Sequence, residues 1–410
     1  MSTIRYLIAV VASKRWSLYQ LDVNNAFLHG DLKEEVYMQV PQGYGNIRDK
    51  VCKLKKSLYG LKQASRQWFA KLVNELISQD YQQSKSDHSL FTKREKDNLT
   101  ILAIYVDDII LTGNSDTEIK NIKAHIDTAF SIKDLGKLHF FLGIDLNYLD
   151  GGIVLSQNKF IKSLLKEHYQ DKTTRQTLTP LPIHLKLLAL EGTLMDDPTP
   201  YRSIVGKLKY LTNTRPDLAY DVQTLSQFMQ KPRDFHWKAL HHTLSYVERT
   251  CGQGILLKAT NKITVQAFSN SDWGSCIDSR RSITRYLIML GQSPVSWKSK
   301  KQGTVSRSSS KAEYRAMASI AAEITWINLV FHDRRKHIDV DCHFTRDKVL
   351  EGLIQLSYLP TKHQLADVLT KVLPSPQFQT LLTGLGMVTP HSSLRGDVKN
   401  RSAYHTKPNN

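Results

Sequence analysis

The stretch from residue 99 to residue 113, LTILAIYVDDIILTG, decides the fold because it places two adjacent aspartates inside an apolar run. LTILAIYV and IILTG are each long enough for a short strand, and Asp107 and Asp108 between them predict a β-hairpin with both carboxylates at its turn. Buried carboxylates need a compensating partner, and neighbouring ones repel each other. Asp also favours turns for local reasons, so the motif alone leaves a purely structural turn open.

The segments around the hairpin predict an α+β layer of strand, helix, hairpin and helix. LYQLDVNNAFLHG, from Leu18 to Gly30, predicts a strand that carries Asp22 near its end. SDTE, from Ser115 to Glu118, predicts a capped helix start. A helix between the two strand segments is indicated by six residues on one helical face: Trp68, Phe69, Leu72, Val73, Leu76 and Ile77.

Asp22 and the hairpin aspartates can form one cluster if their strands are neighbours in a sheet. Three carboxylates at one sheet edge are stable only with cations, and two Mg²⁺ ions held in this way support phosphoryl transfer. Mn²⁺ is an acceptable substitute for this donor set. The cluster therefore predicts two-metal chemistry on a nucleotide substrate, with a polar hairpin tip as the competing interpretation.

Composition indicates a polyanionic partner. Lys and Arg total 56 against 38 Asp and Glu, which gives a net charge of +18 spread along 410 residues. An excess of this size favours nucleic acid, although charge alone also fits a merely soluble basic protein. The four scattered cysteines support neither disulfides nor a zinc site. The apolar N-terminal segment predicts a short buried helix rather than a signal peptide, and no run approaches the length of a membrane span.

The predicted secondary structure changes twice in the second half of the chain. Residues 160–258 are expected to be mainly helical, with interruptions at DKTTRQTLTPLP and DDPTP. From residue 263 onward, ITVQAFS, RYLIML and PVSWKSK predict three successive strands, and a helix is expected to start near Ser310. The final twenty or so residues are polar, and we expect them to be disordered.

Five ordered blocks carry a resemblance to a known family: QLDVNNAFLHGDLKEEVYM, KSLYGLKQASRQW, YVDDIILTG, DLGKLHFFLGID and YRSIVGKLKYLTNTRPDLAY. Together they resemble the reverse transcriptase of Ty1/copia-type retrotransposon Pol polyproteins, and plant copia elements in particular. The resemblance implies a polymerase palm whose catalytic, Mg²⁺-binding residues are Asp22, Asp107 and Asp108. It further implies an RNA template, a DNA primer, RNA–DNA hybrids and deoxynucleoside triphosphates as partners.

The same resemblance assigns residues to the nucleotide site. Phe27 falls where the family has the aromatic residue that excludes a ribose 2′-hydroxyl, although a core aromatic is a serious alternative. Tyr105 and Val106 are expected beneath the primer end, and GIVLSQNKFI resembles the primer-gripping strand pair. The LYGLKQ block would contact the incoming nucleotide through Tyr59, Gly60, Lys62 and Gln63, or it is solvated surface.

Downstream, FSNSDWGSCIDSRRSITRYLIMLG, VSRSSSKAEYRAMA and YLPTKHQLADVLTK resemble the family's ribonuclease H. Asp272, Glu313 and Asp367 match its Mg²⁺ ligands. Glu313 also fits a capping box from Ser310, and Asp367 also fits an exposed helix face. Asn270 replaces the family's first aspartate, and a strand with a further catalytic aspartate is missing between EITWINLV and FHDRRKHIDVDCH. We therefore expect little or no ribonuclease H activity.

The resemblance divides the α+β chain into four regions. These are a palm with the fingers largely missing (1–165), a mainly helical thumb or connection (166–260), an incomplete ribonuclease H-like α/β domain (261–374) and a partly disordered tail (375–410). Because fingers strands would precede Met1 in the family, the chain is expected to be an N-terminally truncated reverse transcriptase that is weak or inactive alone. The alternative is a dead relic that binds RNA or DNA. Either protein is expected inside the cell, in cytoplasmic retrotransposon particles; the oligomeric state stays open.

Overall fold

The computed structural model describes residues 1–44, 50–169, 177–261, 263–331, 341–360, 363–369 and 371–389. The chain combines helices and sheets, as the sequence predicts, and forms two compact units. The first unit comprises residues 15–138 and 325–337, and the second comprises residues 1–14, 139–324 and 338–410. The boundaries of these units do not coincide with those of the four predicted regions, because residues 152–155 pair with residues 255–258.

The first unit contains a six-stranded antiparallel sheet with the order β4-β5-β6-β7-β1-β8, and β2 pairs with β3 separately. The predicted hairpin is confirmed, since β6 pairs with β7 across the aspartates. The elements are β1 (Ser17–Val23), η1 (Ala26–His29), β2 (Tyr37–Gln39), β3 (Val51–Lys53), α2 (Ala64–Ser78), β4 (Gln82–Gln83), β5 (Leu90–Glu95), β6 (Asn98–Tyr105), β7 (Asp108–Gly113), α3 (Asp116–Phe130) and β8 (Ile132–Lys137).

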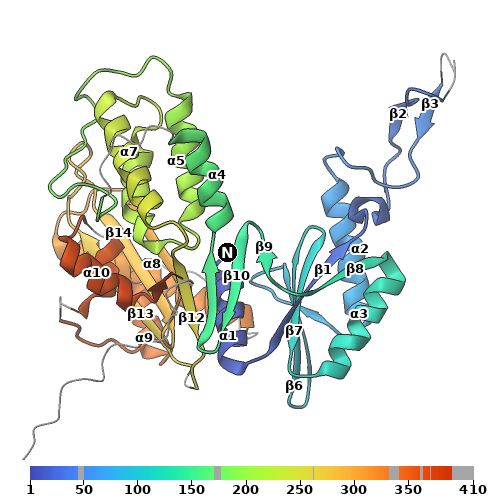
Figure 1. Cartoon of the computed structure of the whole chain (residues 1–410). Coiled ribbons are helices and arrows are strands. Elements are labelled where there is room, and N and C mark those ends of the chain that lie inside the picture. The colour runs from blue at the N-terminus through green and yellow to red at the C-terminus, as the bar shows by residue number, and fades with distance from the viewer. Residues whose placement is uncertain are drawn as a thin grey trace, which may run out of the picture. The chain divides into compact units, whose positions relative to one another are not determined.

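Helices α2 and α3 lie side by side along this sheet and close its core (Figure 1). Their buried side chains recur every three or four residues, which places them on one helical face. The predicted stripe on α2 is narrower than expected, because Ile77 is 53% exposed. The predicted start of α3 is confirmed, since Ser115 Oγ accepts a hydrogen bond from the Glu118 amide at 3.3 Å. The main core residues are Leu21, Trp68, Leu72, Leu76, Ile109, Leu111, Ile119, Ile122, Ile126 and Phe130.

The second unit contains a five-stranded sheet with the order β16-β12-β11-β10-β9 and a three-stranded sheet with the order β13-β14-β15. Helix α8 (Ser309–Phe331) contributes to both units. The other elements are α1 (Ser2–Lys14), β9 (Phe140–Phe141), β10 (Ile144–Leu149), β11 (Gly152–Ser156), α4 (Asn158–His168), α5 (Thr199–Leu211), η2 (Pro216–Leu218), α6 (Ala219–Leu225), η3 (Ser226–Phe228), α7 (Asp234–Arg249), β12 (Gly254–Lys258), β13 (Val265–Asp272), β14 (Ile283–Leu290), β15 (Ser293–Lys301), α9 (Asp341–Leu350), η5 (Leu365–Leu369), α10 (Ser375–Gly384) and β16 (Met387–Val388).

Most predicted elements of this unit are confirmed. The N-terminal segment forms the buried helix α1, the three predicted strands are β13 to β15, and α8 begins one residue before Ser310. The expected tail beyond residue 375 is ordered at first, because α10 buries Phe378 and Leu381. The final residues 390–410 lie outside the described part of the chain. Among the described helices, none is long and apolar enough to cross a membrane.

A buried ion pair lies among the helices of the second unit. Arg215 and Asp217 are both 0% exposed, and Arg215 Nη2 donates to Asp217 Oδ2 at 2.7 Å. The Tyr246 hydroxyl, from α7, donates to the same carboxylate oxygen at 2.8 Å. The guanidinium also donates to Thr250 Oγ1 at 2.7 Å. Because each charge has several partners, the network offsets the cost of removing these groups from water.

Candidate active site

The three predicted catalytic carboxylates lie at one edge of the six-stranded sheet. Asp22 near the end of β1 is the direct cross-strand partner of Asp108 at the start of β7. Directly opposite residues point to the same face of a sheet, so these two carboxylates share a face. Asp107 occupies the turn that Tyr105 and Asp108 close. The sequence prediction that a neighbouring strand brings Asp22 to the hairpin is thus correct in its geometry.

The hairpin turn is held by hydrogen bonds from two other elements. Val106 has a φ of 58°, whereas Asp107 is not among the residues with positive φ. A positive φ is unfavourable for a β-branched side chain. The Trp68 indole Nε1 donates to the Val106 carbonyl at 2.6 Å, and the Val23 amide donates to the Asp107 carbonyl at 3.0 Å. These bonds from α2 and β1 keep the strained turn in place.

The negative charges at this sheet edge favour a bound cation. Burial raises the pKa of Asp108, and the charges of Asp107 and Asp22 raise it further, against a hydrogen bond from Gln20 that lowers it. Gln20 Nε2 donates to Asp108 Oδ1 at 3.0 Å. Carboxylate oxygens are the donors Mg²⁺ prefers, and a cation would relieve this repulsion. Within the described ranges, however, no three His, Cys, Asp or Glu side chains are already grouped to hold a metal ion.

The residues predicted to bind the nucleotide lie in two places in the first unit. The rings of Phe27 and Tyr59 are in contact, with centroids 4.6 Å apart. Phe27 is partly buried and packs against the core, as the alternative of a core aromatic expects. Gly60 has a φ of 95° and open space where a Cβ would be, which suits an exposed turn. Exposed Lys62 and half-buried Gln63 follow it, and Gln63 donates to Glu34. Tyr105, at the hairpin turn, is 53% exposed.

A second acidic cluster forms in the second unit, where β13, α8 and η5 meet. Asn270 Nδ2 donates to Asp367 Oδ1 at 2.7 Å, and the Ser271 amide donates to Glu313 Oε1 at 3.0 Å. Asp367 is only 2% exposed, so the alternative that it lies on an exposed helix face is wrong. The alternative that Glu313 caps α8 is also wrong, because Ser308 Oγ accepts the bond from the Lys311 amide.

An internal cation compensates this second cluster. Arg285 lies directly opposite Asn270 on β14, and its Nη2 is 3.4 Å from Asp272 Oδ2. Burial raises the pKa of Glu313, against the Ser271 bond and the charge of Arg285. Burial lowers the pKa of Arg285 to about 10, so the guanidinium stays charged at neutral pH. Because protein donors and a guanidinium already engage the carboxylates, this arrangement does not fit a pair of Mg²⁺ ions. The position of the missing strand falls at residues 332–340, outside the described residues.

Comparisons with known proteins identify the family of the chain. The family described as reverse transcriptase (RNA-dependent DNA polymerase) matches residues 1–182. The putative transposon Ty5-1 protein of Saccharomyces cerevisiae is 31% identical over 74% of this chain and 100% of its own length. The chain belongs to the copia-type retrotransposon Pol polyprotein family.

Two plant members of the copia family match nearly the whole chain. The retrovirus-related Pol polyprotein from transposon RE1 of Arabidopsis thaliana is 40% identical over 94% of this chain, which is 28% of RE1. The corresponding polyprotein from transposon TNT 1-94 of Nicotiana tabacum is 34% identical over 94% of this chain, which is 32% of that relative. The chain therefore spans about a third or less of the polyproteins it matches.

Sequence reasoning missed three side chains that shape the two clusters of this copia-type chain. Gln20 lies two residues before Asp22 on β1, and a period of two would have placed both on one face. Trp68 was assigned to the core from the apolar stripe of its helix, and the hydrogen bond from its indole to the hairpin turn was not predicted. Arg285 lies at the start of the apolar run RYLIML. Because a cation in a buried strand needs an acidic partner, its position there could have indicated a nearby carboxylate.

Proposed function

We propose that the first unit is the palm of an RNA-directed DNA polymerase, with Asp22, Asp107 and Asp108 as its catalytic carboxylates. The observation that carries the proposal is the cross-strand pairing of Asp22 with Asp108 beside the turn that holds Asp107. Two Mg²⁺ ions, or Mn²⁺ in their place, would be held by these three carboxylates. When bound, such ions activate a primer 3′-hydroxyl and neutralise the triphosphate.

The chain's own residues around this edge support a template, primer and nucleotide site. Gln20 orients Asp108 through its hydrogen bond, and Trp68 holds the turn on which Asp107 sits. Phe27, in contact with Tyr59, would exclude a ribose 2′-hydroxyl by steric clash and so select deoxynucleotides. Gly60, Lys62, Gln63 and Tyr105 would contact the incoming nucleotide and the primer end. An RNA template, a DNA primer and their hybrid are the proposed partners, inside the cell in retrotransposon particles.

For the second unit we propose a helical thumb or connection followed by a ribonuclease H-like domain without nuclease activity. The support is the engagement of Asp272, Glu313 and Asp367 by Arg285, the Ser271 amide and Asn270 respectively. A nuclease of this class needs those oxygens for its metal ions. Hydrolysis of the RNA strand in an RNA–DNA hybrid by the full chain would contradict this part of the proposal.

The polymerase proposal is tested by primer extension. The full chain receives an RNA template, a DNA primer, dNTPs and Mg²⁺, beside the double variant Asp107→Asn, Asp108→Asn. A matched control, Asp97→Asn with Asp116→Asn, removes two exposed carboxylates from the same unit. Extension by the wild type and the control but not by the catalytic variant supports the proposal. Extension that survives in the catalytic variant overturns the assigned site.

Binding of RNA or DNA without catalysis is the second candidate function. The specific observations in its favour are the +18 net charge and the lack of a grouped metal-ligand set among the described residues. Phosphate neutralisation by Lys and Arg gives affinity that is strongly salt-dependent. If the wild type fails to extend any primer but binds the hybrid with such a salt dependence, this candidate replaces the polymerase.

A further inference from the structure

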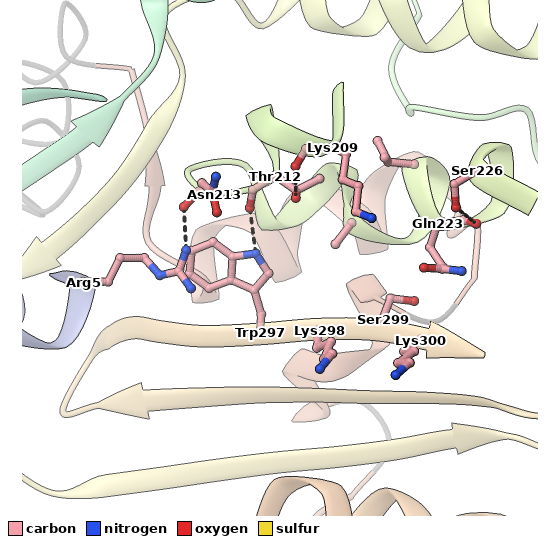
Figure 2. A pocket seen from close by; sticks show the side chains of 12 residues that line it. Arg5, Lys209, Thr212, Asn213, Gln223, Ser226, Trp297, Lys298, Ser299 and Lys300 are labelled. Carbon is pink, nitrogen blue, oxygen red and sulfur yellow. Dashed lines mark hydrogen bonds between the residues drawn. The ribbon is translucent and has the colours of Figure 1, made fainter. Parts of the chain in front are cut away.

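A pocket in the second unit shares no lining residue with the second acidic cluster, although its residue Ser299 is the cross-strand partner of Arg285. It has a volume of about 360 Å³ and opens between α5 and α6 on one side and β15 on the other (Figure 2). Pockets of this size accommodate small organic ligands. The residues that line it include four cations and no Asp or Glu. Arg5 and Lys209 come from helices, whereas Lys298 and Lys300 alternate along β15 with the buried Trp297 and Ser299 and project from the opposite face of the strand. The charge of the lining therefore favours an anion.

The cationic residues differ in what they can offer a ligand. Arg5 is fixed by the structure itself, because it donates to the Val295 and Asn213 carbonyls and stacks on Trp297 with its guanidinium carbon 3.9 Å from the ring centroid. Lys209 is exposed and reaches from α5 toward β15 (Figure 2), and none of the ion pairs among the described residues involves it. The positive charge of Arg5 and the exposed ammonium of Lys209 are thus available together.

A buried hydroxyl marks the floor of this pocket. Ser299 is 9% exposed, it lines the pocket, and its Oγ has no hydrogen-bond partner. An unsatisfied buried hydroxyl costs free energy that a bound acceptor would recover. Figure 2 shows Ser299 on β15 facing the space below Gln223 of α6, whose side-chain amide points toward the same space. Lys209, Gln223 and Ser299 therefore surround one region with hydrogen-bond donors.

We propose that this pocket is a phosphate-binding site, formed by Lys209, Gln223 and Ser299 in the field of Arg5. A phosphate group presents several acceptor oxygens and a negative charge, which match an ammonium, an amide and a hydroxyl donor. A metal cation does not fit, because the lining has no carboxylate. The phosphate belongs either to a free nucleotide or to a nucleic-acid backbone, and the pocket recognises the group common to both. The site does not use Asp22, Asp107 or Asp108.

The test is a binding titration of the full chain in metal-free buffer, where the carboxylates of the proposed polymerase site have no ions to recruit a nucleotide. Inorganic phosphate, dAMP and a short single-stranded DNA serve as three separate probes. Lys209→Gln and Ser299→Ala should each weaken binding about tenfold, because each removes one hydrogen bond to a charged group. Lys238→Gln removes an exposed lysine of α7 that does not line the pocket, and it should leave binding unchanged.

The outcomes separate the two sources of phosphate. Loss of phosphate and dAMP binding in both pocket variants supports a site for free nucleotides, and loss confined to DNA supports a backbone contact. Equal binding by the wild type and both variants overturns the proposal, as does a wild type that binds none of the probes. Ser299→Ala guards against a folding artefact, because removing an unsatisfied hydroxyl should preserve or raise thermal stability.

Discussion

Asp22 and Asp108 are direct partners across β1 and β7, in the pair that ends the register of these two strands. Residues 86 positions apart in the chain thereby place their carboxylates on one face of one sheet. A slip of one residue would move Asp22 to the opposite face and separate the two groups. The buried residues Leu21 and Ile109, which are partners in the same register, prevent that slip because each would be exposed by it.

The first prediction concerns the pH dependence of stability at this pair. The folded-state pKa of Asp108 lies above its unfolded value of about 3.9. The folded state therefore favours the protonated carboxyl of Asp108. The resulting stability is fully present below the unfolded pKa, and it is lost as the pH rises through the folded-state pKa and the carboxyl ionises. Without metal, Asp108→Asn should stabilise the fold at pH 7 by roughly 0.5 kcal/mol, because solvent screens a half-buried group.

Thermal unfolding in metal-free buffer measures this effect across the pH range. The difference between Asp108→Asn and the wild type should shrink to zero as the pH falls below 4. Asp97→Asn, in the exposed turn between β5 and β6, is the control and should change little. A variant that is less stable than the wild type at pH 7 would show that the repulsion from Asp22 and Asp107 is already compensated.

The second prediction concerns backbone strain in the turn. Val106 holds a φ of 58°, which costs a β-branched residue on the order of 1–3 kcal/mol. Glycine adopts this φ without strain but loses more conformational freedom on folding. Val106→Gly should therefore stabilise the fold by up to about 1 kcal/mol in denaturant unfolding. Val51→Gly, at an exposed position of β3 that is 62% accessible, should instead destabilise it slightly.

The third prediction concerns Asn270 in the second cluster. Asn270→Asp replaces the amide that donates to Asp367 with a carboxylate 2.7 Å away, so a hydrogen bond becomes a repulsion. The change should cost about 1–3 kcal/mol of stability without metal, and added Mg²⁺ should recover part of the loss. Thermal unfolding with and without Mg²⁺ checks both statements. Asn147→Asp, at an exposed position of β10, is the control, and equal effects of the two substitutions would contradict the prediction.

Local sequence patterns were sufficient for the elements that surround the proposed polymerase site. The apolar runs on both sides of Asp107 and Asp108 defined the hairpin, and the helical spacing from Trp68 to Leu76 defined α2. These predictions succeed because each depends on residues close together in the chain. The placement of β1 beside β7 needed the additional assumption that three carboxylates share a metal site, which the strand pattern alone does not contain.

Long-range pairing explains what the sequence could not predict. Strand β11 pairs with β12 a hundred residues later, and β12 pairs with β16 near the end of the described chain. No local pattern specifies such partners, so the two compact units cross the predicted regions. The compensation of Asp272 by Arg285 was missed for a related reason: a buried cation in an apolar strand points to a partner without saying which carboxylate it is.

The last prediction concerns the buried pair of Arg215 and Asp217. Both side chains are fully buried, and the carboxylate also accepts the Tyr246 hydroxyl, so Asp217→Asn would leave a guanidinium without its counter-charge. Loss of one partner of such a pair costs about 3–5 kcal/mol. Denaturant unfolding should show this loss, whereas Lys238→Ala, which breaks an exposed pair with Asp234, should cost under about 0.5 kcal/mol.

A double variant distinguishes a charge effect from a packing effect at this pair. Arg215→Met with Asp217→Leu removes both charges while it keeps apolar volume in the same place. Replacing a whole buried ion pair by apolar residues is often neutral, so the double variant should be more stable than Asp217→Asn. If the double variant is the less stable of the two, the bonds from Arg215 to Thr250 hold the helices together independently of the charge on Asp217.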